Sequence, residues 1–210
     1  MRTYRQYCGL AKALDIVGDR WTLLIVRELL LLGPSRYTDL RNGLPGIATN
    51  LLVDRLRELE EAGVVERTEA PPPVATTLFC LTPRGEALRP VIKALGAWAG
   101  PTLESWDRED EFRSHWLALP LDLHLVDRAP ARAPVTIEVR TGDRPIAIEV
   151  GSGEVRVRPG TTDSADLVVT GPPDAVLATL LGRLPPATAR RRGVRFEGDE
   201  KVLQRVQPRR

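Results

Sequence analysis

The chain has 210 residues, with 42% hydrophobic and 28% charged residues, which is ordinary for a soluble globular protein of one large or two small domains. The 30 basic and 28 acidic residues give a formal net charge of +2, so any nucleic-acid surface must be a local patch rather than a basic domain. Its two cysteines, Cys8 and Cys80, form neither a disulfide framework nor a zinc ligand set, which favours a reducing cytoplasm.

The first clear helical pattern lies in the most apolar run of the chain. Apolar side chains recur there at spacings of three and four, which stripes one helix face, at Trp21, Leu24, Ile25, Leu29 and Leu32. The run is about a dozen residues long and contains Arg27 and Glu28, whereas a membrane span needs roughly 20 apolar residues. We therefore predict a core helix ended by Gly33-Pro34, and no membrane partner.

Two further helices are predicted next. The stretch RYTDLRNGL, residues 36–44, favours a short helix, and a longer one begins near Ala48 and ends at Gly63. Leu52, Leu56 and Leu59 form the buried stripe of the longer helix. Its first turn, with Thr49 and Asn50, then points away from the body.

A hairpin and a fourth helix follow. Residues 64–69 and 76–82 are strand-like, and APPPVA at 70–75 marks an exposed tip because proline cannot donate within a central ladder. Pro83 opens a helix that runs to about Ala99 and bends at Pro90.

The second half of the chain has a different pattern. A helix-like stretch at 104–119 precedes runs of period two at 121–125, 135–139, 146–150 and 155–157, and then a strand at 165–170. A helix is expected from Pro172 or Pro173 to Leu181, and a short strand and a final helix within 193–206. We predict an α+β chain with two domains, 1–104 and 105–210, the second an antiparallel sheet with helices on one face.

The order of elements in the first half points to DNA. Three short helices and a hairpin resemble a winged helix-turn-helix, in which the first turn of the recognition helix meets base edges. Asn50 can bond adenine, Thr49 can bond a base or a phosphate, and Arg55 is better placed for phosphate. The alternative is that Thr49 and Asn50 are helix caps and Arg55 is a solvated charge.

Two long motifs carry a family resemblance. The stretches GDRWTLLIVREL and LPGIATNLLVDRLRELEEAG, followed by LTPRGEAL, resemble the HxlR-type relatives of MarR winged-helix regulators over about residues 4–100. The resemblance implies a homodimer, paired through helices at both ends of the domain, on a palindromic operator, with 70–75 at the wing tip. The residues predicted to contact DNA are Thr49, Asn50, Val53, Arg55, Arg36 and Arg67.

This chain departs from the family pattern twice. Relatives commonly carry Ser or Thr where Ala48 stands, so Thr49 is expected to take over as the helix cap. The wing of relatives often has basic residues, but none lies between Glu69 and Cys80. We therefore expect weak contact between the wing and the DNA backbone.

Residues from about 120 to 207 resemble the sterol-carrier-protein-2-like fold, on the alternating strands, ADLVVTGPPDAVLATLLGR and GVRFEGDEKVLQRV. The resemblance implies a sheet and helices that can enclose a hydrophobic ligand. The candidate ligand-binding residues are Val176, Leu177, Leu180, Leu181, Ile137 and Ile148. The alternative is that these side chains fill a closed core.

Other chemistry finds less support. Cys8 occupies the place where the HxlR-type family sometimes senses oxidants, although a thiol packed near a dimer interface is the alternative. The run ARRRG at 189–193 suits an acidic head group or DNA phosphate, but a solvated run is favoured. We predict no catalytic residue, cofactor or metal site, since neither a phosphate loop nor a nucleophile elbow is present and His115 and His124 have no partners at ligand spacing.

We thus predict a cytoplasmic bacterial DNA-binding regulator, a repressor and no enzyme, whose second domain binds a hydrophobic effector or stabilises the dimer. A variant of this prediction is regulation by oxidation of Cys8. The rival is a carrier protein for hydrophobic ligands whose winged helix makes protein contacts.

Overall fold

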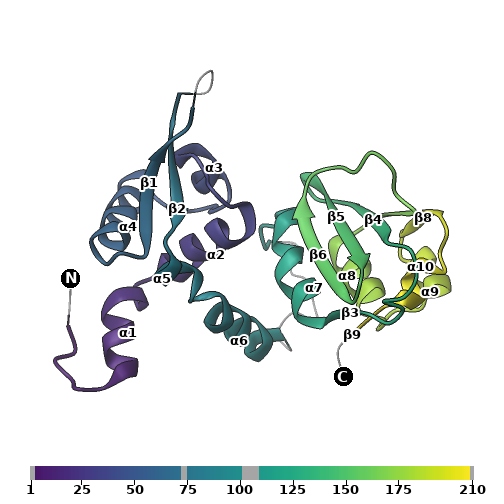
Figure 1. Cartoon of the computed structure of the whole chain (residues 1–210), viewed down its shortest axis with the longest axis horizontal. Coiled ribbons are helices and arrows are strands. Elements are labelled where there is room, and N and C mark those ends of the chain that lie inside the picture. The colour runs from purple at the N-terminus through teal and green to yellow at the C-terminus, as the bar shows by residue number, and fades with distance from the viewer. Residues whose placement is uncertain (1–2, 72–74, 101–108, 209–210) are drawn as a thin grey trace. The chain divides into compact units, whose positions relative to one another are not determined.

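The structure is a computed structural model that describes residues 3–71, 75–100 and 109–208 (Figure 1). It divides into two compact units, Met1–Ala94 and Leu95–Arg210, which we call the first and second units and describe separately. The predicted domain boundary after Glu104 lies outside the described residues.

The first unit contains the predicted winged helix-turn-helix. Its elements are α1 (Gly9–Val17), α2 (Thr22–Leu32), α3 (Tyr37–Asn42), α4 (Thr49–Glu61), β1 (Val65–Glu69), β2 (Thr77–Leu81), α5 (Pro83–Glu86) and the start of α6 (Arg89–Ala99). The antiparallel β1–β2 hairpin confirms the predicted wing. The periodicity of the sequence did not lead us to predict α1.

One core holds the three central helices against the hairpin. Its fully buried side chains come from α2, α3 and α4 and include Ile25, Leu40, Leu52, Leu56 and Leu59. Ser35 extends the hairpin, because its N–H and C=O each bond the backbone of Phe79. The leucine stripe read from the sequence is therefore the side of α4 that faces this core.

The helix predicted over Pro83–Ala99 is broken rather than bent. It forms α5 and α6, with Pro90 in the first turn of α6. Proline has no N–H to donate to a carbonyl one turn earlier, whereas the first helical turn needs no such bond. A break just before Pro90 satisfies both conditions.

The second unit is a sheet with helices. After a 3₁₀ turn at Ser114–Leu117 come α7 (Ala118–His124), β3 (Leu125–Asp127), β4 (Val135–Thr141), β5 (Arg144–Gly151), β6 (Glu154–Pro159), β7 (Leu167–Thr170), α8 (Pro173–Leu180), α9 (Pro186–Arg191), β8 (Arg195–Gly198), α10 (Val202–Arg205) and β9 (Val206–Pro208). The strand order is β6-β5-β4-β7-β8, and β3 pairs with β9 separately.

Three details of this unit differ from the prediction. The β4–β7 pairing is parallel, so the sheet is not purely antiparallel. Residues 186–191, including most of the arginine run, form helix α9. Residues 121–124, predicted as part of a strand, belong to helix α7, in which Leu121 is buried and Leu123 is partly buried. The alternating leucines that predicted a strand therefore lie on two sides of one helix.

A buried ion pair ties the end of the second unit to its beginning. Arg205 of α10 donates from Nε and Nη2 to the two carboxylate oxygens of Asp127 in β3, at 2.9 and 3.1 Å. The side chain of Asp127 is fully buried and also accepts the N–H groups of Ala129 and Gly153. Bonds from Arg205 above all hold the pKa of Asp127 down at about 2, against an ordinary 3.8.

This lowered pKa predicts an acid-sensitive second unit. Because the folded pKa of Asp127 lies below the unfolded value, its stabilising contribution is present above about pH 4 and is lost as the pH falls towards 2. Urea unfolding followed by circular dichroism at pH values from about 7 to about 2 should show this loss. Asp127→Asn should flatten the pH dependence in that window, and an equally steep dependence in the variant would contradict the assignment.

Candidate nucleic-acid interface

The first turn of α4 is open to solvent. Thr49 and Asn50 are exposed, and Val53, one turn on, keeps 50% of its surface accessible. Leu52, Leu56 and Leu59 are buried on the other side. The helix therefore presents the predicted base-contacting residues outwards while its apolar stripe holds it to the core.

The N-cap residue of this helix has no side chain that could cap it. Ala48 is the N-cap and makes no side-chain hydrogen bond, and Thr49 lies inside the helix, so the expectation that Thr49 replaces the cap is wrong. First-turn N–H groups without a protein cap, together with the partial positive charge of a helix N-terminus, favour a phosphate oxygen.

Neighbouring elements fix where α4 begins. The hydroxyl of Tyr37 in α3 donates to the carbonyl oxygen of Thr49 at 2.9 Å. Gly46 precedes the helix with a φ of +86°, a left-handed conformation that suits glycine. Both features hold the tight connection that the sequence predicted between α3 and α4.

Arg55 points to the protein instead of the solvent. Its Nη1 donates to Asp19, between α1 and α2, at 2.6 Å and also to Glu58, and only 18% of the side chain is exposed. A contact between Arg55 and a phosphate would require the guanidinium to leave both carboxylates. The partner Asp19 lies 36 residues away, so helical periodicity gave no signal for it.

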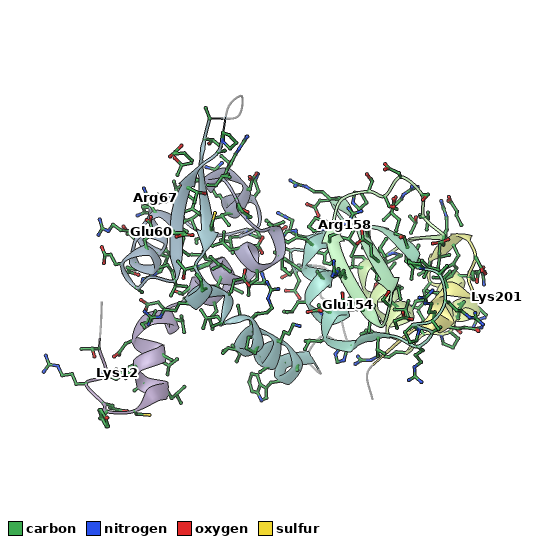
Figure 2. All side chains as sticks on the ribbon, in the orientation of Figure 1. Lys12, Glu60, Arg67, Glu154, Arg158 and Lys201 are labelled. Carbon is green, nitrogen blue, oxygen red and sulfur yellow. The ribbon has the colours of Figure 1, made fainter. Side chains whose placement is uncertain are left out.

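The other two predicted arginines are more accessible. Arg36 precedes α3 and is exposed, and its backbone N–H is bonded to Asp39. Arg67 of β1 pairs with Glu60 of α4 at 2.6 Å and lies 5.3 Å from the centre of the Phe79 ring. Figure 2 labels Arg67 and Glu60 where β1 faces α4. Half of the Arg67 side chain remains exposed.

The wing brings little positive charge. Ala70 bonds the carbonyl of Thr76 across the base of the tip, and residues 72–74 of the predicted tip lie outside the described residues. The sequence from 70 to 79 contains no lysine or arginine. Contacts of this wing with a DNA backbone therefore depend on Arg67.

A buried carboxylate behind the α3–α4 connection was not anticipated. Glu28 of α2 has no exposed surface and pairs with Arg27 at 2.7 Å. Burial lowers the pKa of Arg27, and Glu28 raises it back in part. A side chain at Gly43 would collide with the Glu28 carboxylate, 1.9 Å from the position of its Cβ. A side chain at this position would force the buried Glu28 carboxylate to move, a constraint that the structure shows and the sequence pattern did not.

The candidate ligand-binding residues of the second unit lie together in its core. Val176, Leu180 and Leu181 of the α8 region are buried in one cluster with Ile137 of β4 and Ile148 of β5. Leu177 packs against the same cluster and is partly buried. The arrangement brings the predicted set together around one apolar centre.

The described residues hold neither a group of three His, Cys, Asp or Glu side chains placed for a metal ion nor a helix long and apolar enough to cross a membrane. Cys8 is exposed just before α1, and Cys80 is partly buried in β2.

Comparisons with known proteins agree with both units. Residues 16–107 match the HxlR-like helix-turn-helix family model, and residues 126–208 match the SCP-2 sterol transfer family. The HTH-type transcriptional regulator YvaP of Bacillus subtilis is 39% identical over 88 residues, which cover 42% of this chain and 81% of YvaP. The regulator YodB of the same organism is 35% identical over 95 residues, covering 45% of this chain and 84% of YodB.

A solved structure of YodB in its reduced form is 33% identical and covers 49% of this chain and all of that one, with a TM-score of 0.41. The HxlR-like match lies mostly in the first unit, and the SCP-2 match lies within the second. Residues 126–208 match the SCP-2 sterol transfer family, and the chain belongs to the HxlR-like helix-turn-helix family of transcription regulators.

Proposed function

We propose that this regulator binds a palindromic operator in the cytoplasm as a homodimer, with the first turn of α4 in the major groove, and represses transcription. The observation that carries the proposal is the uncapped start of α4, where Thr49, Asn50 and Val53 are exposed opposite a buried leucine stripe. A recognition helix needs both features, an exposed side that enters the major groove and a buried side that packs on the protein.

Each exposed residue has a role that its chemistry supports. The Asn50 amide suits a bidentate contact with adenine, and Thr49 suits a base edge or a phosphate. The Val53 side chain suits the methyl group of thymine. Arg36 and Arg67 suit phosphates on either side of the groove.

Apolar surface on two helices supports the homodimer. Large hydrophobic side chains are exposed on and before α1 and along α6, namely Tyr4, Tyr7, Leu10, Leu14, Val91, Leu95 and Trp98. Trp98 keeps 83% of its surface accessible, which is costly for so large an apolar group in water. We assign these side chains, on each helix separately, to pairing with a second copy of the chain.

Gel shift with duplexes from the region upstream of the chain's own gene tests the proposal. Specific retardation that unlabelled operator relieves and scrambled DNA does not would support it. Absence of specific binding at every salt concentration would instead favour the rival, a hydrophobic-ligand carrier whose winged helix contacts proteins.

The weakly basic wing predicts a shallow salt dependence. Each neutralised phosphate contributes about −0.9 to the slope of log K against log salt, so few phosphate contacts give a small slope. Fluorescence anisotropy of the operator complex across a salt series measures it. A slope steeper than about −10 would contradict weak backbone contact.

We also propose that the second unit binds a hydrophobic effector within the core formed by α8 and strands β4 and β5. The match to the SCP-2 sterol transfer family and the shared apolar cluster support this. Native mass spectrometry of the purified full chain would detect a copurified apolar ligand and the dimer mass together. If the protein is purified without any step that removes lipids and still shows the mass of the chain alone, the result would favour a closed, filled core.

Oxidation of Cys8 is the alternative signal, supported by the exposure of its thiol. If operator release by diamide is the same in Cys8→Ser as in the parent chain, this variant of the proposal fails.

A further inference from the structure

The turn between α1 and α2, residues 18–21, contacts the recognition helix and the connection before it. Asp19 accepts a hydrogen bond from Arg55 Nη1 at 2.6 Å. The ring of Trp21 reaches the α3–α4 connection, 3.7 Å from the position that a Cβ on Gly46 would occupy. Trp21 adopts a φ of +80°, an uncommon backbone conformation for a residue with a large side chain. The turn at residues 18–21, which contains one strained residue, therefore contacts both α4 and the connection that precedes it.

The guanidinium of Arg55 is committed to this turn. Glu58, on the same helix, accepts from the same Nη1 atom. In the described part of the chain the Nε of Arg55 is buried without a hydrogen-bond partner. Two carboxylates beside one guanidinium also oppose its attraction to a phosphate. Arg55 is therefore built into the protein, not displayed to a ligand.

Directional contacts add something that the leucines of α4 do not supply. Apolar burial is non-directional and leaves a helix free to make small rotations about its axis. Hydrogen bonds depend on both distance and angle. The Tyr37–Thr49 bond acts at the start of α4, and the Asp19–Arg55 pair acts about one and a half turns later. Together they set the direction in which Thr49 and Asn50 point.

We propose that Asp19, Arg55 and Tyr37 are positioning residues for DNA recognition, and that Arg55 contacts no phosphate. The inference rests on the proposed function, because it concerns the same helix and the same DNA. Asp19 is 58% exposed, and its negative charge repels DNA. The inference nevertheless gives Asp19 an indirect part in operator specificity, through its bond to Arg55.

The experiment compares the full-length chain with Arg55→Gln, Asp19→Asn and the double variant, using anisotropy with operator and scrambled duplexes between about 50 and about 300 mM salt. We expect each single variant to bind the operator about fivefold more weakly or worse, which is the low end of the value of one base contact. Scrambled-DNA affinity and the salt slope should stay unchanged. The double variant should be no weaker than Arg55→Gln, because Arg55→Gln already removes the bond to Asp19.

Tyr37→Phe should act in the same direction, since it removes only the hydroxyl that holds the start of α4. Arg57→Gln is the matched charge control, because Arg57 lies on α4 with a 3.7 Å partner at Glu61 and is 71% exposed. Circular dichroism checks folding, and Asp19→Asn keeps the test valid if Arg55→Gln does not fold.

The phosphate-contact alternative predicts the opposite pattern. Arg55→Gln would then reduce the salt slope by about 0.9 and weaken operator and scrambled DNA alike. Asp19→Asn would tighten binding, since it removes a negative charge and releases the guanidinium. Either result, or equal effects of Arg57→Gln and Arg55→Gln, would overturn the inference while leaving the proposed function standing. A parent chain that binds no operator would overturn both.

Discussion

Arg205→Met should destabilise the second unit by about 3 to 5 kcal/mol, the usual cost of leaving one partner of a buried ion pair uncompensated. Asp127 is fully buried and, among the described residues, would keep only the N–H groups of Ala129 and Gly153 as donors. Hydrogen exchange of amides in β4 and β5 reads the stability of this unit without interference from the first.

Two further variants sharpen that measurement. Arg158→Met removes an ion pair of 2.6 Å with Glu149 in which both side chains are nearly half exposed, and should cost less than about 1 kcal/mol. The double variant Asp127→Asn/Arg205→Met should recover much of the loss, because no buried charge is left unpaired. Equal costs for Arg205→Met and Arg158→Met would show that burial does not set the value of the Asp127–Arg205 pair.

Asn50→Ala should weaken binding to the operator about 5- to about 150-fold, corresponding to about 1 to 3 kcal/mol for one bidentate base contact. Binding to scrambled DNA should change little, since that binding depends on phosphates. The exposure of Asn50 makes a folding defect improbable as the cause. Competition anisotropy with operator variants should also show relaxed preference at one adenine, the base that we propose Asn50 contacts.

Arg36→Gln provides the contrast to this variant. If Arg36 contacts a phosphate, Arg36→Gln should weaken binding to operator and to scrambled DNA by similar factors. It should also lower the salt slope by about 0.9. If Asn50→Ala and Arg36→Gln behave alike, Asn50 is not reading a base.

Sequence patterns predicted the features that local periodicity controls. The leucines of α4 recur at spacings that place them on one face, so the exposed position of Asn50 followed directly from the buried positions of Leu52, Leu56 and Leu59. The hairpin could also be predicted, because a proline-containing stretch separates its two strand-like runs. These predictions needed no knowledge of distant contacts.

Features that depend on distant partners were not readable in this way. The pairing of Arg55 with Asp19, 36 residues earlier, could not be predicted from local periodicity. Arg205 and Asp127 are separated by 78 residues, and nothing in either local pattern announces a buried pair. The leucine alternation before Leu125 gave a strand prediction because a short helix with two apolar sides has the same pattern.

The claim that the exposed first turn of α4 reads a duplex is tested most directly by the affinity ratio between operator and scrambled DNA for the parent chain at physiological salt. We predict that a dimer of the protein binds one operator duplex at least about a thousandfold more tightly than scrambled DNA. Equal affinities for the two duplexes, from a folded and dimeric protein, would contradict the account.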